Sequence, residues 1–269
     1  MERDVSRCHA CRHIVVPAGL VRRADGASIY ESEDSIFRAD GNEEYYVDDT
    51  NLEAARVKRA YVARYCRPGA RLLDVGASYG HFLAEAHGQY RATGIEVSPA
   101  AVAWGREHFQ VDLRVGSVYD LPHEAGDFDA VTFWDVIEHL EQPATAVDEI
   151  RRRLKPGGLF FLSTPDAGSL VARAMGSRWH YLDPIQHINL FSRANLTRLL
   201  REHGFNIVDS RYFGRSYRVS YVANRLIYLA LAKGPTSGPV DRAPSRWFRR
   251  WTIPIKLWDV MGIAARRGE

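Results

Sequence analysis

Short apolar runs alternate with amphipathic stretches along most of the chain. Apolar runs bounded by turn residues predict buried strands, and they occur at residues 71–75, 90–97, 111–115, 130–134, 159–163 and 205–212. Stretches with helical spacing of apolar residues predict helices at residues 52–65, 81–87, 100–108, 143–155 and 193–203. Strands that alternate with helices are typical of a parallel sheet covered on both faces, so we predict an α/β fold.

The stretch at residues 70–83 joins the first predicted strand to the next helix through a turn of small residues between Gly76 and Gly80. A strand, a glycine turn and a helix place backbone N–H groups where a nucleotide-like ligand can approach closely. The Gly-x-x-x-Gly spacing differs from the dinucleotide Gly-x-Gly-x-x-Gly fingerprint. The turn therefore does not indicate an NAD-dependent dehydrogenase.

This stretch resembles the first motif of class I S-adenosylmethionine (SAM)-dependent methyltransferases, in which the strand ends in Asp-x-Gly-x-Gly-x-Gly. Asp74, Gly76 and Gly80 match the motif, and Ser78 takes the place of its middle glycine. The resemblance implies a Rossmann-like sheet of seven strands and SAM as the cofactor. It also implies that these four residues border the cofactor.

Two further strand ends are similar to adenosine-binding positions of this family. Glu96 ends the second predicted strand, where a carboxylate can accept hydrogen bonds from both ribose hydroxyls, and Val97 follows it. After the third strand the family often has an Asp that binds the adenine amino group, and Ser117 stands there in this chain. The resemblance implies that Ser117 contacts the adenine through its hydroxyl or its backbone, with the N–H of Val118 facing the ring.

The loop after the fourth predicted strand carries acids and a histidine. Trp134 ends that strand, and residues 135–139 follow at its carboxyl end, where open α/β sheets bind their ligands. The loop is similar to the Glu-His loop of SAM-dependent methyltransferases that act on small metabolites, and this resemblance places Trp134 at the cofactor. The turn at residues 154–158 is another sign of the family. Together the motifs cover about residues 45–165.

Two histidines are candidates for a catalytic base. Methyl transfer to a hydroxyl or carbon acceptor requires removal of a proton near neutral pH, a task that suits histidine. His139 lies in the loop after the fourth strand, and His187 lies in an insertion at residues 164–191, where this fold usually builds the acceptor pocket. We favour His187 because it lies on the acceptor side. A role as a hydrogen-bonded loop residue explains each histidine equally well.

The acids of the same loop leave alternatives open. Asp135 and Glu138 could serve as the base, orient a histidine, or bind hydroxyls of the cofactor and the substrate. With His139 and His187 they could also bind a divalent metal. Their spacing is not distinctive for a metal site, so we expect none.

Residues 1–45 are polar and irregular, which predicts an N-terminal flap. Cys8 and Cys11 form one Cys-x-x-Cys pair, half of the four ligands of a closed zinc site. Some sugar-nucleotide methyltransferases carry an N-terminal zinc module with two such pairs, and this segment resembles a reduced version that we expect to be metal-free. Tyr46 precedes the helix that usually covers the cofactor. It could close that site or pack the flap onto the body.

Residues 216–269 are expected to form a C-terminal cap and the last strand. An apolar stretch at residues 219–232 predicts a helix, and the alternating segment from Asp259 predicts a seventh, antiparallel strand. Residues 246–251 mix arginine with tryptophan and phenylalanine. This segment could make a peripheral contact with a membrane or a glycolipid, although packing of its aromatic residues on the body explains it better.

Composition limits the classes of protein. The 269 residues are 46% apolar and 26% charged, which suits a sizeable soluble domain with additions. A net charge of +3 is too small to indicate nucleic-acid binding, and the fourth-strand loop lacks the Pro-Pro-aromatic sequence of nucleic-acid methyltransferases. Three irregularly spaced cysteines, and the lack of a signal-peptide pattern or of about 20 consecutive apolar residues, favour a soluble cytoplasmic protein.

The sequence thus predicts a flap at residues 1–45, a SAM-binding core at residues 46–215 and a cap at residues 216–269. The predicted activity is methyl transfer from SAM to an oxygen, or less readily a carbon, of a small polar acceptor. A sugar or glycan-related acceptor follows only from analogy with sugar methyltransferases. The alternative is a non-catalytic protein of the same fold, because serines replace two motif residues; the retained ribose-binding acid and Glu-His loop argue against it. The oligomeric state is not predicted.

Overall fold

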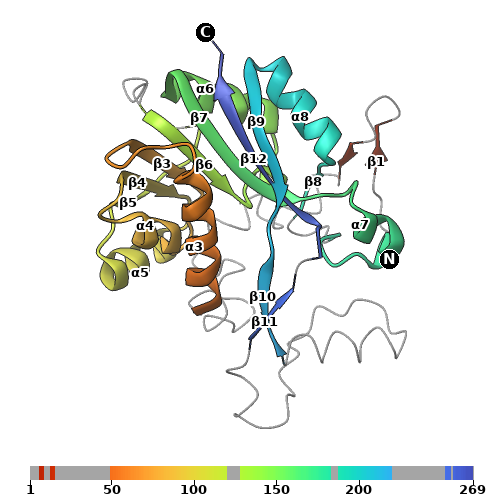
Figure 1. Cartoon of the computed structure of the whole chain (residues 1–269), viewed down its shortest axis with the longest axis horizontal. Coiled ribbons are helices and arrows are strands. Elements are labelled where there is room, and N and C mark those ends of the chain that lie inside the picture. Colours follow the sequence, from red (N-terminus) through yellow and green to blue (C-terminus); the bar gives the residue numbers. More distant parts are fainter. Residues whose placement is uncertain are drawn as a thin grey trace, which may run out of the picture.

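A seven-stranded sheet with the strand order β5-β4-β3-β6-β7-β12-β9 forms the centre of the molecule (Figure 1). The computed structural model describes residues 6–8, 13–15, 49–119, 128–182, 187–219, 252–255 and 257–268. The strands of this sheet are β3 (Arg71–Val75), β4 (Arg91–Glu96), β5 (Leu113–Val115), β6 (Phe128–Trp134), β7 (Leu154–Pro165), β9 (Phe205–Tyr212) and β12 (Val260–Arg267). Neighbouring strands from β5 to β7 pair in parallel, whereas β12 is antiparallel to β7 and β9. The predicted α/β fold with an antiparallel last strand is confirmed.

Helices connect the strands, and serine side chains cap the first turn of some of them. They are α3 (Asp49–Val62), α4 (His81–Ala86), α5 (Pro99–Phe109), α6 (Pro143–Arg153), α7 (Leu170–Met175) and α8 (Arg193–Glu202), with short 3-10 turns η3 (Ile137–His139) and η4 (Gly176–Arg178). Ser98 caps α5 by accepting a hydrogen bond at its Oγ from the N–H of Ala101 (3.3 Å). Ser192 and Asn195 form a reciprocal capping box at the start of α8. These caps fix where two loops at the carboxyl edge of the sheet end.

Apolar side chains cover both faces of the sheet. Along β6, Val131 and Phe133 belong to a buried cluster that includes residues of α6 and α8. Ala130 and Trp134, which alternate with them, belong to a second cluster with residues of α3 and α4. A strand buried on both faces must be apolar at consecutive positions, which explains the apolar runs of the sequence. Figure 1 shows α3, α4 and α5 gathered beside the β3–β5 half of the sheet.

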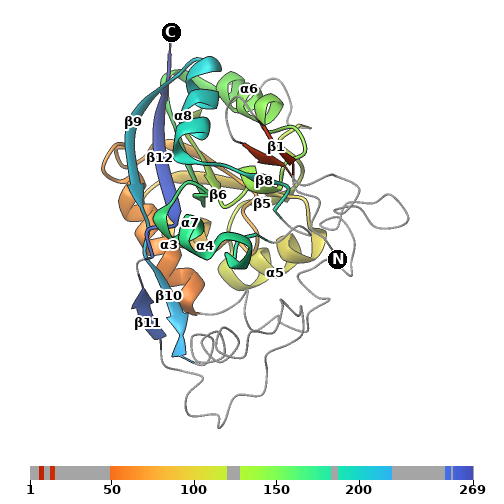
Figure 2. The same cartoon turned by 90° about the vertical axis from the view of Figure 1, so that its right-hand side faces the viewer.

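The N-terminal segment contributes short strands instead of an entirely irregular flap. β1 (Ser6–Arg7) and β2 (Ile14–Val15) pair antiparallel, and β2 pairs in turn with β8 (Asn189–Leu190). Figure 2 shows β1 beside β8. The prediction of an irregular segment is therefore wrong for these residues. A second pair, β10 (Arg215–Arg218) and β11 (Thr252–Ile255), extends from the end of β9.

Two predicted boundaries move by a few residues. β7 begins at Leu154, earlier than the predicted residue 159, because Leu154 already pairs with Phe128. Consequently, α6 ends at Arg153. The predicted glycine turn lies inside this strand, with Gly157 at a φ of +75°.

Several predicted features lie outside the described residues. They are Tyr46, Cys11, most of the helix expected at residues 219–232, and the aromatic and basic segment at residues 246–251. Cys8 is described and exposed. Within the described part of the chain, no helix combines the length and the hydrophobicity that crossing a bilayer requires.

Candidate active site

The glycine turn between β3 and α4 packs directly on the loop that follows β6. Gly76, Ser78 and Gly80 all have positive φ angles, of +69°, +49° and +81°. A Cβ atom at Gly76 would lie only 2.5 Å from Cγ2 of Val136, so a glycine is required for this contact. The turn and the loop at residues 135–139 thus border one region at the carboxyl edge of the sheet, as the sequence predicts.

The backbone N–H groups of this turn bind within the protein. The N–H groups of Gly76 and Ala77 donate to the carbonyl of Ile95 at 2.9 and 3.0 Å, and that of Gly80 donates to the carbonyl of Ala77 at 2.9 Å. The N–H of Ser78 donates to Oε2 of Glu96 at 2.9 Å. These four N–H groups are therefore not bare, and contact between the turn and the cofactor stays a prediction.

Replacing Ser78 with glycine is expected to raise the free energy of unfolding by about 0.5–1 kcal/mol. A side chain at a φ of +49° costs about 1–2 kcal/mol, of which the greater flexibility of glycine in the unfolded chain offsets part. Urea unfolding measures the change. Gln110→Gly, at a φ of +53° after α5, is a matched variant remote from the turn and should gain similarly. A loss of stability in Ser78→Gly would contradict the strain argument.

Glu96 is the buried acid of the site. This residue is 6% exposed. Its Oε1 accepts a hydrogen bond from the N–H of Ser98 at 3.0 Å, and its Oε2 accepts the hydrogen bond from the N–H of Ser78 at 2.9 Å. Burial raises the pKa of Glu96, and these backbone donors oppose the rise. Each carboxylate oxygen can accept a second hydrogen bond, so the group can still bind a pair of hydroxyls. The neighbouring Val97 is half-buried.

Asp74 lies beneath the turn. It is 1% exposed, and Oδ1 accepts a hydrogen bond from Oγ1 of Thr132 at 2.6 Å, which joins the ends of β3 and β6. Burial raises the pKa of Asp74 to about 7, while the Thr132 hydroxyl and the charge of Lys58 act in the opposite direction. This geometry supports the turn from below, and contact between Asp74 and the cofactor stays a prediction.

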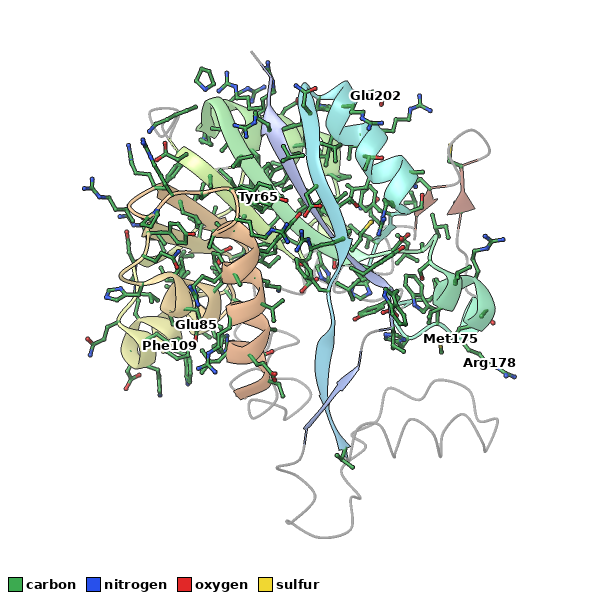
Figure 3. The ribbon with its side chains drawn as sticks, in the orientation of Figure 1. Tyr65, Glu85, Phe109, Met175, Arg178 and Glu202 are labelled. Atoms are coloured by element: carbon green, nitrogen blue, oxygen red, sulfur yellow. The ribbon has the colours of Figure 1, made fainter. Side chains whose placement is uncertain are left out.

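An ion pair that the sequence does not reveal closes one side of the region. Nζ of Lys58, on α3, lies 3.1 Å from Oδ2 of Asp135 and 5.4 Å from the ring centroid of Trp134. Oδ1 of Asp135 accepts a hydrogen bond from Oγ of Ser163 at 2.9 Å. α3 lies against α4, where Glu85, labelled in Figure 3, pairs with an arginine of α3. Lys58 is one of several cations on α3, so no sequence signal singles it out.

The other predicted cofactor residues differ in how they are placed. Val118 is 3% exposed and belongs to the main apolar cluster. Oγ of Ser117 accepts a hydrogen bond from the N–H of Tyr119 at 3.3 Å. The ring of Trp134 packs on Phe82 with centroids 5.3 Å apart, and its buried indole N–H has no hydrogen-bond partner among the described residues. The assignments of these residues to the cofactor stay predictions.

The two histidines predicted as bases come together at this edge. The ring centroids of His139 and His187 are 4.9 Å apart, and Nδ1 of His187 lies 2.7 Å from the carbonyl oxygen of Tyr181. Glu138 beside them is 1% exposed; burial and the charge of Asp135 raise its pKa, and His187 opposes the rise. Ligand atoms of Glu138, His139 and His187 lie within 4.8 Å of one another, so within the described part of the chain this group could hold a divalent cation.

Aromatic rings continue from His187 into the insertion. Tyr181 lies 6.0 Å from His187, 4.2 Å from His180 and 5.6 Å from Trp179, measured between ring centroids. Buried Asp259, just before β12, lies 3.4 Å from Nε1 of Trp179 and 3.5 Å from Nε2 of His180. The insertion therefore places a group of packed aromatic and imidazole rings next to His187.

Comparison of the sequence with known proteins identifies the family of the chain. A family model described as a methyltransferase domain matches residues 47–210. The ubiquinone biosynthesis O-methyltransferase of Xanthomonas campestris pv. campestris is 44% identical over 117 residues, 40% of this chain; the match spans about half (48%) of that relative. The protein of the same name from Xanthomonas axonopodis pv. citri is 34% identical over 209 residues, 69% of this chain and 85% of that protein. The chain belongs to the methyltransferase domain family.

Solved structures with low sequence identity share the fold. One is the 1,6-didemethyltoxoflavin-N1-methyltransferase of Burkholderia thailandensis with bound S-adenosylhomocysteine (TM-score 0.54, 17% identity, 98% of this chain and 99% of that chain). Another is the 4+2 cyclase SpnF (TM-score 0.54, 24% identity, 80% of this chain and 81% of that chain). The fold therefore does not by itself decide the reaction, which must be argued from the site.

Proposed function

We propose that this protein is a SAM-dependent O-methyltransferase of a small acceptor. The observation that carries the proposal is the packing of the glycine turn, with Glu96 behind it, against the loop that brings His139 to His187. In this proposal Glu96 binds the ribose hydroxyls of the cofactor, and the histidines serve the acceptor. The proposal thus combines an acid for a nucleoside with a base for a hydroxyl.

His187 is the proposed base, and its tautomer supports this role. A carbonyl oxygen only accepts hydrogen bonds, so Nδ1 of His187 carries the proton shared with Tyr181, and the neutral ring keeps a lone pair on Nε2. Nε2 takes the proton of the acceptor hydroxyl as the oxygen attacks. SAM supplies the methyl group, whose bond to sulfur breaks as the O–CH3 bond forms. The buried carboxyl of Glu138 lies beside the imidazolium that results.

The proposed acceptor is a hydroxyl on a planar aromatic ring. The rings next to His187 are aromatic and buried among apolar residues: Tyr181 lies 6.0 Å from His187 and 5.6 Å from Trp179, measured between ring centroids. Such surroundings suit an aromatic ring better than a sugar. The names of the Xanthomonas relatives point to O-methylation in ubiquinone biosynthesis rather than to a sugar. The sugar acceptor expected from the sequence has no support among these relatives.

Methyl transfer from radiolabelled SAM tests the proposal directly. We expect label on 3,4-dihydroxybenzoate, a soluble catechol, and much less on a free sugar such as rhamnose. Label on the sugar alone would reject the aromatic acceptor. Binding of S-adenosylhomocysteine without transfer to either class of acceptor would favour the non-catalytic alternative.

The group of Glu138, His139 and His187 favours a second role for the same residues. One carboxylate and two imidazoles suit a transition-metal ion such as Zn²⁺ better than Mg²⁺. A cation there would lower the pKa of a bound acceptor hydroxyl, and His187 would then act as a ligand instead of a base.

If His187 is the base, the rate after treatment with a chelator is expected to stay within about twofold of the untreated rate, since no metal ion is removed from the site. A loss that Zn²⁺ or Mg²⁺ restores would establish the metal role.

A further inference from the structure

The N-terminal hairpin forms part of the acceptor side. The N–H of Cys8 donates to the carbonyl of His13 at 2.8 Å and closes the β1–β2 hairpin. Ile14 of β2 pairs with Leu190 of β8, which follows His187 closely in the chain. A segment from the start of the chain therefore extends the insertion that carries His187.

Side-chain hydrogen bonds connect this hairpin to the loop after β6. Nε2 of His13 lies 3.0 Å from Oδ1 of Asn189, across a sequence separation of 176 residues, and Nδ2 of Asn189 donates to the carbonyl of Leu140 at 2.6 Å. Because Nδ2 must face that carbonyl, Oδ1 faces His13, so Nε2 of His13 carries a proton. The His13 ring also packs on Phe191, with centroids 4.6 Å apart.

This network ties together the two segments that carry the histidines. Leu140 directly follows His139, and Asn189 follows His187 with one residue between them. Asn189 is only 6% exposed, so water competes little for its amide. One buried amide thus holds both segments, and His13 fixes the orientation of that amide.

We propose that His13 is a positioning residue that sets the spacing of His139 and His187 through Asn189. This inference rests on the proposed methyl transfer. Without the donor of His13 the amide of Asn189 can rotate and release the carbonyl of Leu140. Displacement of a base by about 1 Å can cost about 100-fold in rate. The cofactor side is held separately by the hydrogen bonds of Glu96 to the backbone.

Three variants test the inference with 3,4-dihydroxybenzoate as the acceptor. His13→Ala is expected to lower kcat at least tenfold and to leave the Kd of S-adenosylhomocysteine unchanged. His13→Gln, whose amide N–H can donate to Asn189, is expected to restore kcat to within about threefold of the wild type. Val15→Ala, in the same hairpin with a side chain 40% exposed, is the matched control and should behave like the wild type.

The outcomes separate this inference from the proposed function. A kcat of His13→Ala equal to that of the wild type, or a parallel loss of S-adenosylhomocysteine binding, would overturn the positioning role. A wild type without any turnover would reject the function. Imidazole C–H signals of His139 and His187 in NMR spectra then test the linkage without turnover. They should shift in His13→Ala and return in His13→Gln, and unchanged signals would overturn the inference.

Discussion

Glu96→Ala is expected to weaken S-adenosylhomocysteine binding by about 100-fold or more in Kd. In the proposed function the carboxylate accepts hydrogen bonds from two ribose hydroxyls, and each hydrogen bond to a charged group contributes about 1.5–3 kcal/mol. Loss of about 3 kcal/mol corresponds to about 100-fold in Kd. Calorimetric titration of the purified protein measures the change.

The same variant also leaves protein groups without a partner. The N–H groups of Ser78 and Ser98 lose their acceptor, so part of the effect could come from the turn itself. Glu96→Gln keeps one accepting oxygen and should bind with intermediate affinity. Glu53→Ala, an exposed acid of α3, is the matched control and should leave Kd unchanged. Wild-type affinity in a folded Glu96→Ala protein would contradict the assignment of Glu96 to the cofactor.

The sheet was predictable because its strands are buried on both faces. β6 contributes alternate residues to two apolar clusters, so its sequence is apolar at consecutive positions and its limits show clearly. The last strand was predicted from the alternating segment that begins at Asp259, and β12 (Val260–Arg267) confirms it. Strands of two residues, such as β2 and β8, carry no period, so the sequence gives no sign of their pairing.

The site was predictable in place but not in its hydrogen bonds. Positive φ angles at Gly76 and Gly80 match the glycine spacing of the motif, and Ser78 adopts one as well. Ile95 and Glu96 accept hydrogen bonds from N–H groups of the turn. These hydrogen bonds depend on the register between β3 and β4, which the sequence does not show. Glu96 was nevertheless correctly expected at the end of its strand.

Side chains that act across long separations escaped prediction. Lys58 reaches Asp135 only because α3 packs on α4, and the other cations of the same helix have similar local sequence. His13 contacts Asn189 because a hairpin from the start of the chain docks on β8. In contrast, His139 and His187 were predicted as candidate bases because the chemistry requires one. The structure brings their ring centroids to 4.9 Å from each other.

His187→Ala is expected to lower kcat by about 100- to 10,000-fold, the range found for loss of a general base. The Kd of S-adenosylhomocysteine should not change, because the proposal assigns His187 to the acceptor and not to the cofactor. His203→Ala is the matched control. Its ring pairs with Asp148 at 2.6 Å just beyond the end of α8, and its removal should leave kcat unaffected.

The pH dependence of kcat tests whether His187 is the general base or has no part in proton transfer. A histidine base acts only in its neutral form, so the wild-type rate should rise with pH as the base loses its proton and then level off. In His187→Ala this rise should disappear, and added imidazole should restore part of the rate because it supplies the missing lone pair. If His139→Ala loses the pH dependence instead, His139 is the base that takes the proton of the acceptor hydroxyl. The hydrogen bond from Nδ1 of His187 to the carbonyl oxygen of Tyr181 then only orients the ring of His187. Full turnover in both variants would remove histidine from the mechanism and leave Asp135 or Glu138 as the base.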